Sequence, residues 1–415
     1  MNHPAKVLYI TYDGLTDPLG RSQILPYLTG LAESGYQIYI LSFEKKEAFS
    51  EFKISVEALL KGTNISWFPM KYTKKPPVFS TVFDIFKLIR YVKKLNKAHS
   101  FSIVHCRSYI ASFGGLALKL KRKTPFIFDM RGFWPDERVE GKLWNLKNPF
   151  YLLIYKYFKK KEYQYLLNAD TLISLTEKGK KELIKKYNIQ ALENKTTVIP
   201  CCADTNFFSR QNIDENILKS KTEKLQIKPN DFIISYSGSL GTWYMPDEML
   251  DFFGQLLMQY PDAKFLIITP DNPEIIYKKA GEKNIPAEKI RVVKAGRNDM
   301  PSLLSLARLS VFFIRPVYSK TASSPTKMGE LMSLGIPFIT NSGIGDVDQL
   351  IKENKAGLLI HDFTTEAYQH AIQKIPELLQ LSPESIRAVA LEKYSLSRGI
   401  ETYKSVYEYL VSKAK

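Results

Sequence analysis

The 415-residue chain is poor in cysteine, in histidine and in long apolar runs. It contains three cysteines, of which Cys201 and Cys202 are adjacent, and five histidines. So few thiols form neither a disulfide framework nor a zinc site, and we expect a reducing compartment. No run approaches the roughly 18 apolar residues of a transmembrane helix. The first residues do not follow the plan of a secretory signal peptide, because their apolar stretch is short and no small-residue cleavage site follows it.

Acidic residues are also in short supply, but only in the amino-terminal half. Residues 1–200 contain 33 lysines and arginines against 17 acidic residues, whereas residues 201–415 contain 26 against 25. The net charge of +17 therefore belongs almost entirely to one half. An asymmetry of this kind indicates that this half meets an anionic partner, either nucleic acid or a membrane surface.

The length and the hydrophobic fraction of 45% predict two or three domains with sizeable cores. In each half, short apolar runs alternate with amphipathic stretches, which predicts β-α alternation and parallel sheets. A polar change of composition marks a linker between the halves. We predict a first domain over 1–208, a linker over 209–230, a second domain over 231–395, and a closing helix over 396–415 that returns to the first domain.

The most informative stretch is residues 311–346. It predicts a buried strand, a loop rich in serine, threonine and proline, a helix that begins near Lys327, and a second strand. Ligands of open parallel sheets bind at the carboxyl ends of strands, and helix N-termini favour phosphate. Lys327 adds a positive charge there, and Glu330 could accept hydrogen bonds from the two hydroxyls of a ribose. The alternative is an ordinary crossover with a solvated loop.

Two stretches in the basic half combine aromatic and basic residues. Residues 83–97 predict an amphipathic helix that could lie on an anionic membrane or simply pack on its own core. Its one predicted apolar stripe consists of Phe83, Phe86, Leu88, Ile89, Val92 and Leu95. Residues 148–167 interleave tyrosine and phenylalanine with lysine. That composition suits the headgroup region of a membrane and also single-stranded nucleic acid.

Another candidate site follows the predicted strand 125–130. Charged residues crowd the loop after it, beginning with Asp129 and Arg131, and active-site loops commonly occupy this position. The alternative is a capped turn in which Arg131 forms a structural ion pair with Asp136 or Glu137.

The order of motifs along nearly the whole chain resembles a known family. The motifs are VLYIT with its glycine loop, NADTLISLTEKGKKEL, VIPCCADTNFF, ISYSGSLGTWY and SSPTKMGELMSLGIPFI. They resemble a retaining glycosyltransferase of the GT-B fold, in glycosyltransferase family four (group 1), and specifically a subgroup with an SPTK-type donor loop. The resemblance implies two Rossmann-like, doubly wound parallel-sheet domains that face a cleft. It also implies a nucleotide-sugar on the second domain, an acceptor on the first, retention of configuration, and no metal or other cofactor.

The same resemblance assigns roles to individual residues. Glu330 matches the glutamate that holds the nucleotide ribose, and the other matches lie in four loops. These are Ser323, Ser324, Pro325 and Thr326 around the diphosphate and sugar, Gly296 and Arg297 at the base, Gly238 and Ser239 at the phosphate-facing turn, and Gly20 on the opposite side of the donor.

Two positions depart from the family pattern. A second glutamate is expected where this chain has Ala322, and a basic pair is expected in the loop that here reads GSLGTWYM. The diphosphate charge must therefore be met by other groups, for which Lys327, Arg315 and Arg297 are candidates, assisted by a helix dipole.

The function predicted from these observations is transfer of a sugar from a nucleotide-sugar to a hydroxyl of a glycan or lipid-linked glycan. A UDP-sugar is the preferred donor. The setting is bacterial lipopolysaccharide, O-antigen or capsule assembly, at the cytoplasmic face of the membrane and without nucleic acid. We expect Lys327, Arg315 and Glu330 to act at the donor, and Asp129 and Arg131 at the acceptor.

Two alternatives remain open at this stage. One is a GT-B sugar-nucleotide epimerase, which would need acid and base groups in the cleft. The other is a non-enzymatic protein that binds nucleic acid through its basic half. No helix-turn-helix, RNP signature or zinc-finger spacing supports the second alternative.

Overall fold

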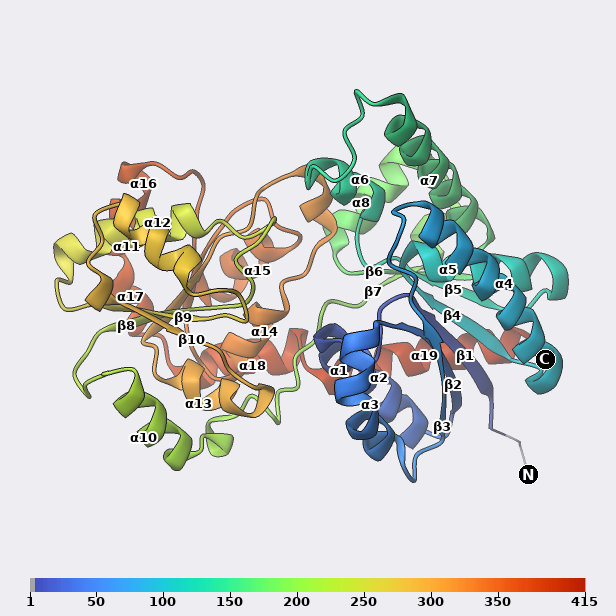
Figure 1. Cartoon of the computed structure of the whole chain (residues 1–415), viewed down its shortest axis with the longest axis horizontal. Coiled ribbons are helices and arrows are strands. Elements are labelled where there is room, and N and C mark those ends of the chain that lie inside the picture. The colour runs from blue at the N-terminus through green and yellow to red at the C-terminus, as the bar shows by residue number, and fades with distance from the viewer. Residues whose placement is uncertain (1–3, 415) are drawn as a thin grey trace. The chain divides into compact units, whose positions relative to one another are not determined.

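The computed structural model describes residues 4–414 and contains two compact α/β units (Figure 1). The first unit comprises the chain up to Pro200 together with the segment from Leu396 onward, and the second comprises Cys201–Ser395. The predicted fold class, two Rossmann-like parallel-sheet domains, is confirmed.

The sheet of the first unit has seven parallel strands in the order β3-β2-β1-β4-β5-β6-β7. The central strands are buried along almost their whole length, because helices cover both faces of a parallel sheet. The strand order reverses between β1 and β4, and ligands of such sheets bind beside this point. The strands are β1 Lys6–Thr11, β2 Gln37–Glu44, β3 Ile65–Lys71, β4 Ile103–Arg107, β5 Phe126–Asp129, β6 Thr171–Ser174 and β7 Thr196–Val198.

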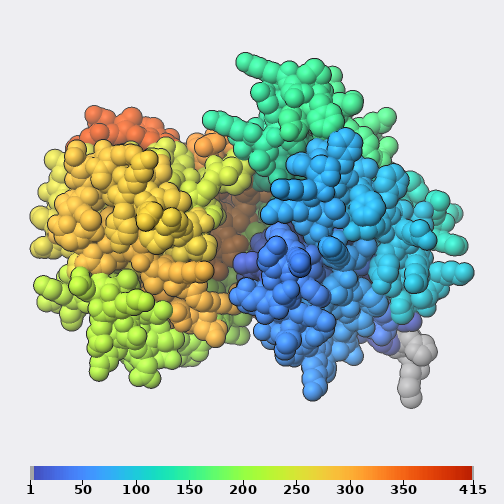
Figure 2. Space-filling model, viewed as in Figure 1, coloured from blue at the N-terminus to red at the C-terminus, as the bar shows by residue number. Residues whose placement is uncertain are grey.

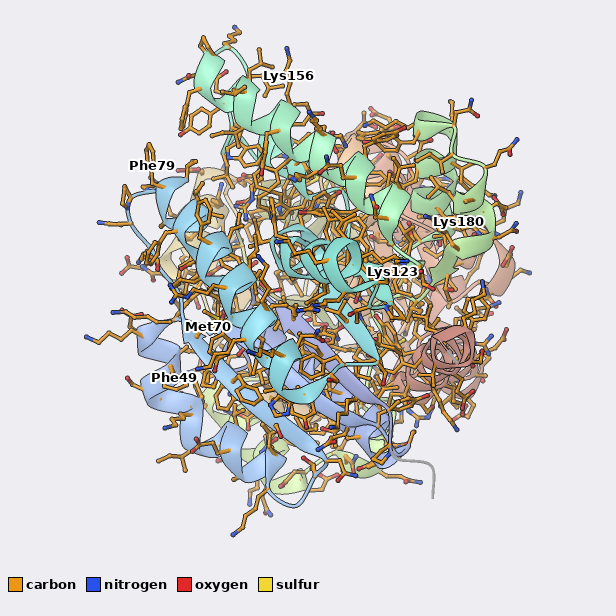
Figure 3. All side chains as sticks on the ribbon, turned by 90° about the vertical axis from the view of Figure 1, so that its right-hand side faces the viewer. Phe49, Met70, Phe79, Lys123, Lys156 and Lys180 are labelled. Atoms are coloured by element: carbon orange, nitrogen blue, oxygen red, sulfur yellow. The ribbon has the colours of Figure 1, made fainter. Side chains whose placement is uncertain are left out.

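Ten helices belong to this unit within residues 4–414. They are α1 Pro18–Gln23, α2 Leu25–Glu33, α3 Lys46–Leu60, α4 Phe79–His99, α5 Ser108–Arg122, α6 Trp134–Glu140, α7 Pro149–Asn168, α8 Glu177–Tyr187, α9 Ala191–Lys195 and α19 Leu396–Ala414. Figure 3 shows α4, α5 and α7 side by side, with Phe79 at the start of α4 and Lys156 on α7. Helices α3 and α4 also form part of the face seen in Figure 2.

The second unit repeats this architecture with six parallel strands in the order β10-β9-β8-β11-β12-β13. The strands are β8 Ile233–Ser237, β9 Lys264–Ile268, β10 Ile290–Val293, β11 Leu309–Phe312, β12 Phe338–Asn341 and β13 Gly357–Ile360. The α-helices are α10 Glu215–Lys224, α11 Pro246–Gln259, α12 Glu274–Glu282, α13 Met300–Ser305, α14 Thr326–Ser333, α15 Val347–Asn354, α16 Thr365–Gln373, α17 Ile375–Leu379 and α18 Pro383–Lys393. Short 3₁₀ turns are η1 Arg210–Asn212, η2 Ala287–Lys289, η3 Arg297–Asp299 and η4 Tyr318–Ala322.

The boundary between the units differs from the one predicted at residue 208. Residues 201–208 group with the second unit, where the guanidinium of Arg387 donates to the carbonyls of Thr205 and Phe208 at 2.8 and 3.0 Å. The predicted linker over 209–230 contains η1 and α10, and α10 packs on α13. Its polar composition is therefore that of a surface helix rather than a free connection.

The closing helix α19 groups with the first unit, where it packs on α2 and on β4. Tyr403 and Tyr407 are almost fully buried on its inner side. Gly30 on α2 allows the close approach, because an added Cβ there would lie 2.4 Å from Cδ1 of Ile400.

Helix α4 carries two apolar stripes, so the single stripe predicted from the sequence was wrong. Leu88 and Val92 pack in the core with no exposed surface. Phe83 and Phe86, which were assigned to the same stripe, remain 56% and 69% exposed. The two sets lie on different sides of the helix because residues three or four apart share a side, while residues two apart do not.

Candidate active site

The candidate donor site of the second unit is built where two loops meet at the carboxyl ends of β8 and β11. Tyr244, in the loop after β8, forms an antiparallel bridge with Ile314. The backbone N–H of Arg315 donates to the carbonyl of Trp243 at 2.9 Å. The loop of residues 238–245 is therefore fixed against the strand that leads into the SPTK segment.

Lys327 lies in the first turn of α14, and its side chain is buried among aromatic rings. Its Nζ lies 3.7 Å from the ring centroid of Tyr244 and 4.2 Å from that of Tyr236. The ammonium has no hydrogen-bond partner among residues 4–414. Burial holds the pKa of Lys327 well below its ordinary value, although the nearby carboxyl of Glu330 acts in the opposite direction. A buried, unpaired ammonium is costly, and an anion at this position would remove the cost.

Gly238 provides the space that Lys327 occupies. Its φ is +132°, a conformation that side chains with a Cβ rarely adopt, and an added Cβ would lie 2.9 Å from Nζ of Lys327. The lysine therefore lies directly against the backbone of the loop that lacks the basic pair of the family. Lys327 of α14 thus brings a basic group to the loop of residues 238–245, which has no basic residue of its own.

The backbone of this loop is held by polar contacts from two sides. The hydroxyl of Tyr236 donates to the carbonyl of Ser239 at 2.5 Å. The N–H of Leu240 donates to the carboxylate of Asp271, also at 2.5 Å. The turn at Gly238 and Ser239 is thus fixed before any ligand binds.

The SPTK segment forms the start of α14. Pro325 is the N-cap and Thr326 is the first helical residue, so the N–H groups of Thr326 and Lys327 have no partner within the helix, while that of Met328 donates to the carbonyl of Pro325 at 3.1 Å. The hydroxyl of Ser324 accepts the N–H of Cys201 at 3.1 Å, and Ser323 follows the turn η4. Ala322, where the family has its second glutamate, is a buried methyl group with 3% exposure.

Glu330 lies one turn further along α14 and is partly exposed. Burial raises the pKa of Glu330 above its ordinary value, and the charges of Arg297 and Lys327 offset only part of this rise. The exposed Arg297 places its guanidinium 4.9 Å from the ring centroid of Phe207. Gly296 before it has open space around its Cα and an ordinary negative φ, so the backbone does not require glycine there.

The predicted donor residues of the second unit thus fall on neighbouring loops of one sheet edge. Lys327 contacts the loop that contains Gly238, and the charges of Lys327 and Arg297 both act on Glu330. Arg315 is half-buried and lies three residues after the end of β11, next to the bridge residue Ile314. The rings of Tyr236 and Tyr244 were missed by the sequence analysis, because nothing in their local pattern indicates that they surround an ammonium.

The glycine loop of the first unit is held by a carboxylate that the sequence analysis also missed. Glu44, at the end of β2, is 3% exposed and accepts the N–H groups of Leu15 and Thr16 at 2.8 and 3.1 Å. Gly20, in α1, allows close backbone packing, since an added Cβ would lie 2.1 Å from the carbonyl oxygen of Gly14. Glu44 lies far from this loop in the sequence, which is why local motifs do not identify it.

Asp129 ends β5 and lies inside the first unit with 1% exposure. Its carboxylate accepts the hydroxyl of Tyr403 at 3.0 Å and lies 3.4 Å from Nε2 of His105. Burial favours a raised pKa, but the charge of Arg131 and the contact with His105 outweigh it, so the pKa of Asp129 is lowered. The carboxylate contacts protein groups rather than solvent, which favours a positioning role.

Arg131 lies near Asp129, and not near Asp136 as one of the two predicted ion pairs would require. Its Nη1 lies 3.9 Å from Asp129, and its φ is +58°. Asp136, one of the two proposed partners, instead accepts from the hydroxyl of Tyr155 at 2.9 Å and from Lys159 at 3.0 Å. The reason is geometric, because Asp136 lies in α6 and faces α7.

A cavity of about 10 Å³ lies beside this group of residues. It is lined by His105, Arg107, Gln23, Tyr27 and Tyr403, among others. That volume accommodates about one water molecule, so a sugar does not fit inside it.

Residues 4–414 contain no group of three or more His, Cys, Asp or Glu side chains arranged to hold a metal ion. Within the same residues, no helix combines the length and the apolar character needed to cross a bilayer.

The comparisons with known proteins agree with this architecture. The family model of Glycosyltransferase Family 4 matches residues 25–207, and that of Glycosyl transferases group 1 matches residues 219–385. A search of curated proteins found no significant match.

Several solved structures share the fold at low sequence identity. Sucrose-phosphate synthase from Thermosynechococcus elongatus has a TM-score of 0.74 at 14% identity, covering 99% of this chain and 100% of that one. Anabaena HepE in complex with UDP-glucose has a TM-score of 0.69 at 13% identity, covering 97% and 99%. WaaG, a glycosyltransferase involved in lipopolysaccharide biosynthesis, has a TM-score of 0.69 at 15% identity, covering 97% and 99%. With one glycosyltransferase family model on each unit, the chain belongs to the group 1 glycosyltransferases, and its fold is GT-B.

Proposed function

We propose that this protein transfers a sugar from a UDP-sugar to a hydroxyl acceptor with retention of anomeric configuration. The observation that carries the proposal is the buried, unpaired ammonium of Lys327 beside Gly238 and the start of α14. An ammonium, a close-lying glycine backbone and free helix N–H groups together suit a diphosphate. HepE, which shares the fold, is known in complex with UDP-glucose, and this supports a uridine donor.

The donor lies, in this proposal, along the loops of the second unit. Lys327, the amides of residues 323–326 and the turn at Gly238 and Ser239 receive the diphosphate. Arg315 adds charge at the end of β11. Glu330 accepts the ribose hydroxyls, and Gly296 with Arg297 meets the base. The family resemblance also assigns Gly20, in the glycine loop of the first unit, to donor binding.

The chemical step is a front-face substitution. The acceptor oxygen forms a bond to the anomeric carbon as the bond from that carbon to the diphosphate oxygen breaks. The acceptor proton passes to the departing diphosphate oxygen, so no protein base is needed. Negative charge grows on the diphosphate, and Lys327, Arg315 and the N–H groups of α14 stabilise it. Ala322, in place of a carboxylate, is consistent with a mechanism without a covalent intermediate.

The acceptor in this proposal is a glycan or lipid-linked glycan of bacterial lipopolysaccharide, O-antigen or capsule assembly, and Asp129 with Arg131 positions the acceptor side. The protein acts at the cytoplasmic face of the membrane, to which its basic half is attached. The shared fold with WaaG and the charge asymmetry of the chain support this setting. Juxtamembrane basic residues each contribute about 1 kcal/mol to binding at anionic surfaces.

The proposal is tested by the fate of the donor sugar. We expect the purified protein to bind UDP-sugars more tightly than GDP-, TDP- or ADP-sugars in a thermal-shift panel. NMR spectra recorded during turnover of the preferred donor should show a product whose anomeric configuration equals that of the donor. Inverted product contradicts retention, and interconversion of the donor without transfer identifies an epimerase. Nucleic-acid binding without any nucleotide-sugar affinity overturns the proposal as a whole.

A further inference from the structure

Helices α4, α5 and α7 form one layer of the first unit, and the charges of this layer have a single sign. The three helices, all within the described residues, contain twelve lysines and arginines and two acidic residues, Asp84 and Glu162. Both acidic side chains have no exposed surface. The outer face of the layer therefore carries positive charge alone, within a unit that holds 37 basic against 19 acidic residues.

The two carboxylates point inward because protein groups hold them there. Asp84 accepts the hydroxyl of Tyr12 at 3.0 Å and both the N–H and hydroxyl of Thr73, at 3.0 and 2.8 Å. Glu162 accepts hydrogen bonds from Tyr109, Tyr187 and Lys159. Each carboxylate also forms an ion pair with one lysine of the layer, Asp84 with Lys87 at 2.7 Å and Glu162 with Lys159. Neither can turn outward to neutralise the remaining basic residues without leaving these partners unsatisfied.

The same layer exposes large apolar side chains at helical spacing. On α4, Phe79, Phe83 and Phe86 are 66%, 56% and 69% exposed, and Phe79 marks the start of this stripe in Figure 3. On α7, Leu153 and Tyr157 are 68% and 46% exposed. Positions that recur at intervals of three and four residues lie on one side of a helix. Contiguous exposed apolar surface of this kind marks an interaction site.

We infer that the outer face of the α4-α5-α7 layer docks on an anionic lipid bilayer, with the phenylalanine stripe of α4 inserted below the headgroups. This inference rests on the proposed function, because it specifies which surface brings the enzyme to a membrane-borne acceptor. Aromatic rings beside lysines suit the interfacial region, where rings enter the acyl boundary and ammonium groups reach the phosphates. A nucleic acid offers the same negative charge but no apolar layer for the stripe.

The first test is partition of the full chain into vesicles. We expect binding to vesicles of equal parts phosphatidylcholine and phosphatidylglycerol, and little binding to phosphatidylcholine alone. Phe83→Ser with Phe86→Ser should lower partition by roughly tenfold or more, since buried apolar area drives insertion. Lys93→Gln with Lys94→Gln should lower it by about fivefold per lysine and remove part of the salt dependence.

Helix α3 offers a matched control in the same unit. Ile54 and Leu59 are 80% and 62% exposed, but three glutamates accompany them on α3. Ile54→Ser with Leu59→Ser should leave partition unchanged. Equal partition of wild type and the phenylalanine variant, or an equal loss in the α3 variant, overturns the inference.

A second readout reports insertion directly. The three native cysteines are buried, so a fluorophore on Phe83→Cys is placed selectively. We expect its emission to shift to the blue with anionic vesicles, whereas the same probe on Leu59→Cys stays in water. A probe at residue 83 that stays in water overturns the inference, as does displacement of bound vesicles by DNA at equal charge. Thermal shift with UDP-glucose keeps the two proposals separate, because a wild-type protein that binds the donor but no anionic vesicles rejects only the docking surface.

Discussion

The ammonium of Lys327 lies against the backbone of Gly238, so closely that a Cβ on residue 238 would stand 2.9 Å from Nζ. A lysine from the first turn of α14 and a glycine from the loop after β8 thus define a single position for positive charge. The consequences can be measured separately on each residue.

Replacement of Gly238 by alanine should displace Lys327 and strain the backbone. The φ of +132° costs about 1–3 kcal/mol for a residue with a Cβ. We expect lower thermal stability and a KM for the donor raised by about tenfold or more. Gly241 is the matched control in the same loop, because open space surrounds its Cα. If Gly241→Ala impairs donor binding as strongly as Gly238→Ala, the contact with Lys327 is not the cause.

Replacement of Lys327 by methionine should stabilise the fold while it abolishes transfer. A buried polar group without a hydrogen-bond partner costs about 1–3 kcal/mol when neutral and more when charged, and methionine fills a similar volume without that cost. Because the folded pKa of Lys327 is lowered, stability in the wild type rises with pH between that pKa and the ordinary value near 10.5. Urea unfolding at several pH values should show this slope in the wild type and not in the variant. A variant less stable than wild type at neutral pH would mean that the ammonium is compensated.

Donor binding should take up a proton. Burial lowers the pKa of Lys327 in the free protein, and a diphosphate beside it favours the charged form and raises the pKa again. Affinity for UDP should therefore fall as pH rises above the pKa of the free protein. Calorimetry in two buffers of different ionisation enthalpy measures the uptake, which should disappear in Lys327→Met. An unchanged proton uptake in that variant would assign it to another group.

Replacement of Glu44 by glutamine should loosen the glycine loop of the first unit. The amide presents two donors to a position where the N–H groups of Leu15 and Thr16 need an acceptor. We expect a loss of about 1–3 kcal/mol of stability, measured by thermal unfolding. Glu47→Gln, on the exposed side of α3, is the control and should have little effect. Equal unfolding temperatures for wild type and Glu44→Gln would show that the loop does not depend on this carboxylate.

The sequence alone was sufficient for the two parallel sheets and for the placement of Lys327 and Glu330 on one helix. Alternation of apolar runs and the motif around α14 are local signals, and local signals identify elements well. The ring environment of Lys327, the contact of Glu44 with the glycine loop, and the two sides of α4 depend on which distant segments pack together. The polar stretch over 209–230 was assigned to a linker because composition does not separate a linker from a surface helix such as α10.

The most direct test of the central claim is titration of UDP and of uridine into wild type, Lys327→Met and Glu330→Ala. We expect Lys327→Met to lower the affinity for UDP by about tenfold or more and to leave the affinity for uridine nearly unchanged, because only UDP carries the diphosphate. Glu330→Ala should lower the affinity for both ligands, since both contain the ribose. Wild-type affinity for UDP in both variants would show that the donor binds elsewhere.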